Sequence, residues 1–323
     1  MTDAPIVEAR GLRKTFMVSH AGGVSPLNAL DDVNFDVMAG ETLGLVGESG
    51  SGKSTAGRIL VGLIPATAGT VSLFGRCITG RDGPAALRAV RSRLQFVFQD
   101  PFAALNPRMR VGRSVAEPLE IAAKLSRRDR NHRVAELFEL VGLPKGSTDR
   151  YPHEFSGGQR QRIVIARSLA LNPDFIVCDE PVSALDVSMQ AQIVNLLMDL
   201  QQRLGLTYLF IAHDLAVVRI ISTRVAVLYA GSIVETAPKH DIYARPQHPY
   251  TQALLDAVPR PDPAFIRARA ISGEVPSLLD PPSGCRFHPR CPLAMDRCRT
   301  EVPRLVSSGK DRQVACHLFE QGR

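Results

Sequence analysis

Short apolar runs alternate with helical patterns along the chain up to about residue 237. The runs are ETLGLVG, DFIVCDE and LTYLFIAHD, and the helical patterns extend from about Ser51 to Leu63 and from Ser188 to Leu204. Strands that are buried on both faces of a parallel sheet have continuous apolar runs rather than alternating ones. The pattern therefore predicts an α/β fold with a parallel sheet.

The pattern changes after about Pro238. Of the 23 prolines, 12 lie between Pro238 and Pro303, and proline is excluded from helix interiors and central strands. We therefore expect a core domain over residues 1–237 and an irregular, loop-rich extension over residues 238–323. The chain has no internal repeat, so it holds one such core and not two.

Composition adds limits to this picture. The chain has 323 residues, of which 45% are hydrophobic and 22% charged, as in an ordinary globular protein of about two domains. It has neither a long apolar span nor a signal peptide pattern, so a cytoplasmic location is expected. The net charge of +7 is compatible with nucleic acid, anionic lipid or no special partner. The basic residues are scattered without interleaved aromatics, so we expect no nucleic-acid partner.

The segment GESGSGKST, Gly47 to Thr55, follows an apolar run and precedes a helical pattern. It matches the phosphate-loop motif, in which backbone N–H groups surround phosphate oxygens and a lysine reaches the β- and γ-phosphates. The serine after the lysine is placed to bind Mg²⁺. The predicted nucleotide-binding residues of this loop are Gly47, Ser49, Gly50, Gly52, Lys53, Ser54 and Thr55.

Two acids, Asp179 and Glu180, end the apolar run DFIVCDE. At the end of a buried strand beside the phosphate loop, Asp179 could hold Mg²⁺, and Glu180 could deprotonate the water that attacks the γ-phosphate. An acidic pair alone is more often a solvated helix start, but the phosphate loop favours the catalytic interpretation.

A second anion site is predicted in FSGGQRQR, where Ser156, Gly157, Gly158 and Gln159 open a helical pattern. A chain with one nucleotide has no use for a second phosphate site unless this site serves a neighbouring molecule. The sequence resembles the ATP-binding-cassette (ABC) ATPases, a class of P-loop NTPases. The residues that carry this resemblance occur in the order of that family: the phosphate loop, Gln99 in FVFQDP, SGGQ, DEP, SALD and the histidine of FIAHD.

The resemblance implies a head-to-tail dimer, with ATP held between the phosphate loop of one subunit and the SGGQ signature of the other. It further implies that Gln99 contacts Mg²⁺, that His213 contacts the γ-phosphate, and that Asp186 aligns the opposing subunit. Phe16 takes the place of an aromatic residue that stacks on adenine. The segment of about residues 101–170 corresponds to a helical subdomain that grips the membrane subunit. Phe155 departs from the commoner leucine and leaves SGGQ intact.

The extension narrows the family. The stretches from Arg245 to Pro259 and from Ile271 to Pro292 resemble the C-terminal region of dipeptide and oligopeptide importer ATPases. The resemblance implies an ATPase subunit on the cytoplasmic face of the membrane, with a second ATPase subunit, expected to be a different chain, two permease subunits and a peptide-binding protein. Alternatives are a related importer for nickel or another solute, or a soluble ABC ATPase without a transport role.

The extension also contains four of the six cysteines: Cys285, Cys291, Cys298 and Cys316. Five, six and seventeen residues separate successive cysteines. A short, proline-rich segment with little hydrophobic core gains order when it binds a metal. The spacing lacks the C-x-x-C pattern of structural zinc, and four cysteines suit a 4Fe-4S cluster. The sequence leaves three alternatives: an iron–sulfur cluster, zinc, or free thiols. Cys77 and Cys178 are expected to be buried apolar residues.

Overall fold

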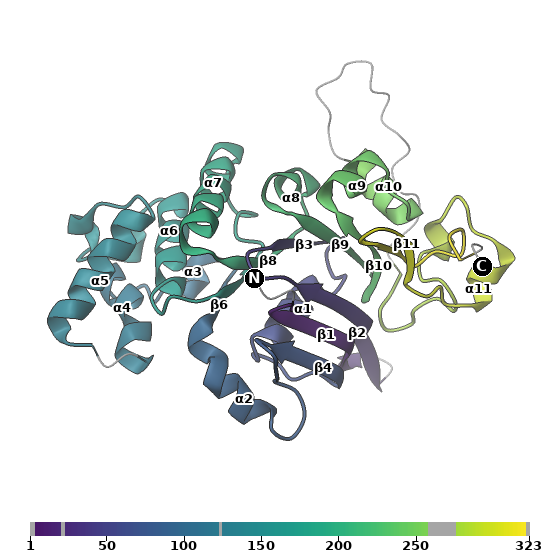
Figure 1. Ribbon diagram of the computed structural model, residues 1–323, viewed down its shortest axis with the longest axis horizontal. Coiled ribbons are helices and arrows are strands. Elements are labelled where there is room, and N and C mark those ends of the chain that lie inside the picture. The colour runs from purple at the N-terminus through teal and green to yellow at the C-terminus, as the bar shows by residue number, and fades with distance from the viewer. Residues whose placement is uncertain (1–3, 21–22, 123–124, 258–275, 321–323) are drawn as a thin grey trace, which may run out of the picture.

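The computed structural model describes residues 4–20, 23–122, 125–257 and 276–320. The described residues form an eight-stranded sheet in the order β11-β12-β10-β9-β3-β8-β7-β6 and a four-stranded sheet in the order β2-β1-β4-β5 (Figure 1). No helix among these residues is both long and apolar enough to cross a bilayer.

The centre of the large sheet is parallel, as the apolar runs predict. Strand β3 lies between β8 and β9, and β7 lies between β8 and β6, all in parallel. Each run is one strand: β3 (Thr42–Val46), β7 (Phe175–Asp179) and β8 (Thr207–Ala212). The neighbouring strands are β6 (Leu94–Val97), β9 (Arg224–Tyr229) and β10 (Ser232–Pro238).

Both faces of this sheet are covered by apolar side chains, which explains the uninterrupted runs. In β8, Leu209 and Ile211 belong to one buried cluster, whereas Tyr208 and Phe210 belong to another. Successive side chains of a strand point to opposite faces, so each cluster takes alternate residues. The two clusters are therefore the two layers of the core.

The small sheet covers one of these faces together with helix α1 (Figure 1). It is antiparallel, and its long strands β1 (Val7–His20) and β2 (Gly23–Val37) form a hairpin. The remaining strands are β4 (Ala68–Leu73) and β5 (Arg76–Cys77). Cys178 is buried as expected, but Cys77 is exposed because β5 is a two-residue edge strand. The expectation of a buried Cys77 was wrong.

The helices surround the sheets, and α4 and α5 lie at the end of the molecule opposite the C-terminal extension (Figure 1). Their bounds in the first part of the chain are α1 (Lys53–Leu60), α2 (Gly83–Val90), α3 (Pro101–Ala104), α4 (Val111–Ala122), α5 (Arg127–Leu140) and α6 (Gly157–Ser168). Those that follow are α7 (Val187–Leu204), α8 (Leu215–Ile221), α9 (Lys239–Ala244), α10 (Pro249–Asp256) and α11 (Asp296–Thr300). Short 3₁₀ helices span Arg91–Arg93, Lys145–Ser147, Pro152–Glu154 and His288–Arg290.

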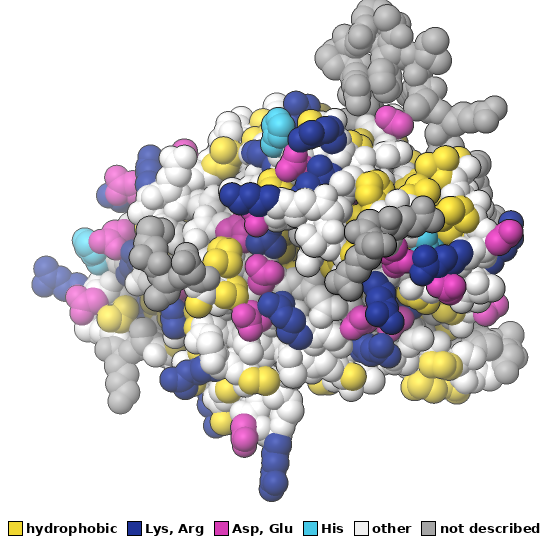
Figure 2. All heavy atoms as spheres, turned by 45° about the vertical axis from the view of Figure 1, so that its right-hand side comes forward, with side chains coloured by type: hydrophobic (Ala, Val, Ile, Leu, Met, Phe, Trp, Pro, Cys, Tyr) yellow, Lys and Arg dark blue, Asp and Glu magenta, His cyan; other side chains and the backbone are white. Residues whose placement is uncertain are grey.

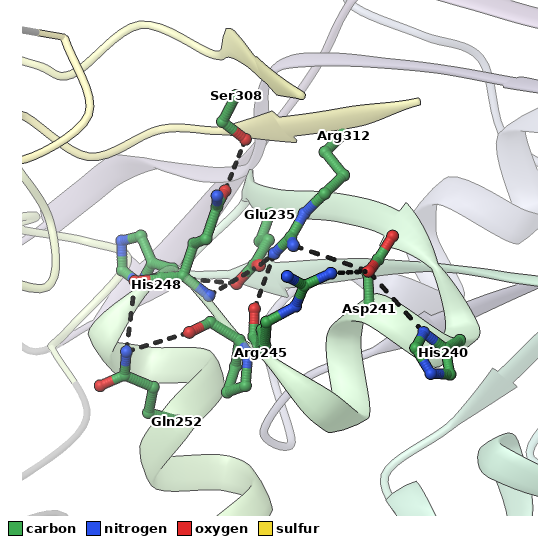
Figure 3. A network of polar contacts seen from close by, with 10 residues as sticks. Glu235, His240, Asp241, Arg245, His248, Gln252, Ser308 and Arg312 are labelled. Atoms are coloured by element: carbon green, nitrogen blue, oxygen red, sulfur yellow. Dashed lines mark hydrogen bonds and ion pairs between the residues drawn. The ribbon is translucent and has the colours of Figure 1, made fainter. Parts of the chain in front are cut away.

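The C-terminal extension adds two strands to the edge of the large sheet. Strand β12 (Arg312–Val314) pairs with β10, and β11 (Val306–Gly309) pairs with β12. The Arg312 guanidinium forms a buried ion pair with Glu235 of β10 and also donates to the Arg245 carbonyl (Figure 3). A buried charge is tolerated only when it is paired, so this pair fixes how the extension lies on the core.

Charged side chains of both signs are mixed on the face seen in Figure 2. Basic residues there lie beside acidic ones. Among the described residues, Arg297 forms a surface ion pair with Glu301. Neither sign forms one continuous area among the coloured side chains of this view.

Candidate nucleotide-binding site

The loop of residues 47–52 joins β3 to α1, and its glycines adopt conformations that other residues avoid. Gly47 has a φ of 153° and Gly52 a φ of 107°. A Cβ atom on Gly47 would lie 2.1 Å from the Leu228 carbonyl oxygen, and one on Gly52 would lie 2.3 Å from the Ala29 carbonyl oxygen. The loop can therefore pack closely against the backbone of Leu228 and Ala29 only because glycine stands at these two positions. Gly52 has no side chain to cap α1, which leaves first-turn N–H groups for an anion.

Lys53 is buried at the start of α1. Its Nζ donates to the carbonyl oxygens of Gly47 and Glu48, both at 2.8 Å, so the lysine is folded back over its own loop. Burial lowers its pKa, while the nearby carboxylates of Glu180, Asp179 and Glu48 act in the opposite direction. The ammonium group thus lies inside the loop, where a phosphate oxygen would replace the carbonyls as its acceptor.

Ser54 and Asp179 come together although their positions differ by 125 in the sequence. The Ser54 hydroxyl donates to Asp179 Oδ1 at 2.7 Å, and Asp179, at the end of β7, is 2% exposed. Burial raises the pKa of Asp179, and the hydrogen bond from Ser54 opposes that shift. A hydroxyl and a carboxylate oxygen are ligands that Mg²⁺ prefers, so this pair fits the predicted magnesium site.

Glu180 lies at the centre of a second cluster. Its Oε2 accepts a hydrogen bond from Gln99 Nε2 at 2.9 Å and lies 3.4 Å from His213 Nδ1. Glu180 has a φ of 46°, a left-handed conformation that is uncommon for residues other than glycine, and its N–H donates to the Ile211 carbonyl. The structure therefore brings together the three residues that the sequence predicted as catalytic, from three separate strand ends.

The predicted signature residues begin α6. Ser156 is the N-cap and forms a capping box with Gln159, in which each side chain accepts the other residue's N–H. The Met189 side chain of α7 covers Gly158, and its Cε lies 1.8 Å from the position of an ideal Cβ. The capping box takes the Gln159 N–H, and the amides of Gly157 and Gly158 precede it in the same first turn. No contact described for these residues joins the signature to its own phosphate loop.

The remaining predicted residues lie at the periphery. Phe16, on β1, is half-buried, and Lys14 Nζ lies 4.8 Å from its ring centroid. Asp186 is the N-cap of α7, and hydrogen bonds from Ser188 and the Met189 N–H lower its pKa. In the loop itself, Ser49 and Gly50 are exposed and Thr55 is half-buried.

Two residues that sequence reasoning missed also contact the phosphate loop. Arg290 forms hydrogen bonds to both carboxylate oxygens of Glu48, and the Tyr250 hydroxyl accepts the Glu48 N–H. Both come from the extension, more than 200 residues along the chain from Glu48. No local motif signals such a contact.

The four cysteines of the extension form no disulfide, and three of them lie near enough to Cys285 to act on its pKa. Burial raises the pKa of Cys285 to about 11, and the other three cysteines act in the same direction. Within the described residues, however, no three His, Cys, Asp or Glu side chains are placed to share one metal ion. His317 is not a free ligand, because Glu320 and the Glu301 carbonyl occupy both ring nitrogens.

Comparison with known proteins identifies the class. Residues 30–183 match the family described as ABC transporter. A dimeric, post-hydrolysis structure of an ATP-binding cassette bound to ADP and phosphate shares 30% identity, with a TM-score of 0.64 over 72% of this chain and 98% of that one. A Clostridium perfringens structure, described as part of an ABC transporter complex, is 26% identical, with a TM-score of 0.64 over 75% of this chain and 92% of that one. The fold and the site thus define an ABC-type ATPase, which uses ATP and Mg²⁺.

The extension places the chain within that class. Residues 234–298 match the family described as oligopeptide/dipeptide transporter, C-terminal region. A Brucella abortus (strain 2308) protein, named as an ATP-binding protein of peptide import, is 62% identical over 97% of this chain and 94% of its own length. The chain belongs to the ABC ATP-binding proteins of the oligopeptide/dipeptide importer family.

Proposed function

We propose that this chain hydrolyses ATP as the cassette subunit of a peptide importer, with Glu180 as the general base. The observation that carries the proposal is the cluster of Gln99, Glu180 and His213 at the strand ends, next to the Ser54–Asp179 pair. The family to which the chain belongs supports peptides as the cargo.

The chain's own residues divide the chemical work. The loop amides and Lys53 bind the phosphates, and Lys53 exchanges the carbonyls of Gly47 and Glu48 for phosphate oxygens. Ser54 and Asp179, with Gln99, hold Mg²⁺, which neutralises charge on the phosphates when bound. Glu180 accepts a proton from the attacking water, and His213, which lies beside the same carboxylate, contacts the γ-phosphate. Phe16 stacks on the adenine ring.

The signature serves a second subunit in this proposal. Ser156, Gly157, Gly158 and Gln159 contact the ATP held by the neighbouring phosphate loop, and Asp186 lies at that boundary. The solved post-hydrolysis relative is a dimer of an ATP-binding cassette, which supports this arrangement. We expect the neighbour to be a related but different ATPase chain.

The proposed assembly includes two permease subunits and an external peptide-binding protein, with this chain on the cytoplasmic face of the membrane. The helical group of about residues 101–170 contacts the permease. Its helices α4 and α5 lie at the far end of the molecule from the extension, which leaves both regions accessible to different neighbours (Figure 1). The domain boundary at residues 237 and 238 is part of the same proposal.

We further propose that Cys285, Cys291, Cys298 and Cys316 hold a 4Fe-4S cluster rather than zinc. The cysteine spacing lacks the C-x-x-C pattern of structural zinc, and the other three cysteines lie near enough to Cys285 to raise its pKa. Four cysteine thiolates are the ligand set of a 4Fe-4S cluster. Iron and acid-labile sulfide content of anaerobically purified protein tests this proposal: about four of each per chain are expected, and zinc or metal-free folded protein would contradict it.

Substitution of Glu180 by Gln tests the central proposal. The variant keeps the hydrogen-bonding shape but not the base, so it should bind a fluorescent ATP analogue normally and lose phosphate release by about 100-fold or more. Glu139→Gln, at an exposed ion pair with Lys145, is the matched control and should hydrolyse ATP like the wild type. Full turnover by Glu180→Gln would contradict the assigned base, and a wild-type chain that binds no ATP would contradict the whole proposal.

A further inference from the structure

The phosphate loop carries an ion pair to the C-terminal extension. Arg290, at the end of the 3₁₀ helix His288–Arg290, donates from Nη1 to Glu48 Oε2 at 2.8 Å and from Nη2 to Glu48 Oε1 at 3.0 Å. Glu48 is the second residue of the phosphate loop, and the Arg290 side chain is 5% exposed. A bidentate arginine–carboxylate pair fixes direction as well as distance.

The backbone of Glu48 is fixed from the same side. Its N–H donates to the Tyr250 hydroxyl at 2.9 Å, and Tyr250 of α10 is fully buried. The Tyr250 ring packs against Tyr229 and Phe287, with centroids 4.5 and 5.5 Å away. Phe287 lies three residues before Arg290, so one rigid aromatic group supports both contacts to Glu48.

A second route reaches the other end of the loop. Arg286 of the extension donates to the Ala230 carbonyl and pairs with Asp31. The next residue, Gly231, donates its N–H to the Ser51 carbonyl at 2.9 Å. The extension therefore contacts the loop directly at Glu48 and, through the β9–β10 turn, at Ser51.

Stability alone is a poor explanation for the Arg290–Glu48 pair. Burial of the Arg290 charge costs free energy that offsets much of its attraction to Glu48, whose side chain is 23% exposed, and the Arg290 Nε has no hydrogen-bond partner. What the pair does fix is the peptide of Glu48, whose carbonyl oxygen accepts from Lys53 Nζ at 2.8 Å. It also neutralises a carboxylate that would otherwise repel the phosphates of ATP.

We propose that Arg290 is a positioning residue of the nucleotide site: it holds the phosphate loop in its ATP-binding shape through Glu48. This inference rests on the proposed function of the loop. A loop that is already ordered avoids the free-energy cost of becoming ordered when ATP binds. Arg290 therefore acts on the affinity for ATP. Hydrolysis of bound ATP depends on Glu180 and its neighbours, none of which contacts Arg290 in the described hydrogen bonds.

The test compares full-length Arg290→Gln, Arg290→Lys and the wild type by titration with a fluorescent Mg-ATP analogue and by phosphate release. Arg290→Gln should raise the Kd and the KM for ATP about tenfold, as losses of supporting contacts around bound groups do. Its kcat should stay within about twofold of the wild type, because the interaction lost acts on binding. Arg290→Lys, which keeps the charge but not the bidentate geometry, should fall between them.

Arg297→Gln is the matched control, because Arg297 forms surface ion pairs with Glu301 and Glu320 in the same extension. It should bind ATP like the wild type. An unchanged Kd in both Arg290 variants would overturn the proposal, and so would a fall in binding stoichiometry at constant Kd, which means partial unfolding only. If Arg290→Gln does not fold, Arg290→Lys alone decides. A wild-type chain that fails to bind ATP would instead contradict the proposed function.

Discussion

Gly52 shows how strictly the loop depends on single backbone positions. A side chain there meets two penalties: a φ of 107° and a Cβ only 2.3 Å from the Ala29 carbonyl oxygen. The second contact is with backbone, which cannot rotate away. The residue is therefore fixed by geometry before any contact with a nucleotide is considered.

Gly52→Ala should lower the free energy of unfolding by about 1–3 kcal/mol, the range of a strained backbone position, and should weaken ATP binding. Urea denaturation and nucleotide titration measure the two effects. Gly40→Ala is the control, since Gly40 has a φ of 74° but open space at its Cβ position. This variant should lose stability only because alanine disfavours the positive φ. Equal losses in the two variants would show that the contact with Ala29 has no role.

The magnesium pair could be predicted at this scale, whereas the Arg290–Glu48 pair could not. Asp179 ends an apolar run, and parallel strands bring their carboxyl ends to one edge of the sheet. The sequence pattern therefore predicts that Asp179 lies close to Ser54. Arg290 lies 242 residues from Glu48 in a segment without periodicity. Its position depends on how the extension packs, which no local signal encodes.

Among the elements, α10 depends on a histidine cap. His248 is 1% exposed, and its Nδ1 accepts the N–H of Tyr250 at 3.0 Å, which requires that nitrogen to be unprotonated. Burial lowers the pKa of His248 to about 3. The unfolded chain therefore takes up a proton near pH 6.5 that the folded chain refuses. This contribution to stability is complete above pH 6.5 and is lost as the pH falls toward 3.

His248→Asn removes that titration and keeps a side-chain acceptor for the helix start. Between pH 6.5 and 5 the wild type should lose stability faster than the variant, by about 1.4 kcal/mol per pH unit once the unfolded histidine is protonated. Chemical denaturation at several pH values gives the two slopes. Parallel slopes would mean that His248 is protonated in the folded state.

In the core, the observed bounds of helices and strands are close to those that the sequence pattern predicts. The second helix was expected from Ser188 to Leu204 and is Val187–Leu204. The first was expected from about Ser51 to Leu63 but spans only Lys53–Leu60, because Gly52 and Gly62 both have positive φ. The strands β11 and β12 gave no sequence signal, since they are short and depend on distant pairing: β12 pairs with β10, and β11 pairs with β12.

For the whole molecule, the separation of the phosphate loop from the SGGQ signature predicts that ATP-dependent association needs the signature. The signature contacts α7 within its own chain. In the proposed arrangement its phosphate partner is another molecule. Ser156→Arg should leave ATP binding to the chain's own loop unchanged but block ATP-dependent association with the partner cassette.

Gel filtration of Glu180→Gln with ATP, with and without the Ser156→Arg change and with the partner chain present, measures this association. Glu139→Gln, at an exposed ion pair with Lys145, is the control and should still associate. Association that survives Ser156→Arg would place the contact elsewhere. A dimer of this chain alone would replace the expected heterodimer.

The distance along the chain between Glu48 and its partners has a consequence for synthesis on the ribosome. The loop leaves the ribosome early, but β3 must wait for β8 and β9, whose registers with it include Thr42 with Tyr208 and Leu43 with Arg224. Tyr250 and Arg290 emerge later still. Such distant pairings form late in folding. A nascent chain therefore has the complete phosphate-loop sequence long before it has the contacts that shape it, and the ATP site is finished only after Arg290 has been made.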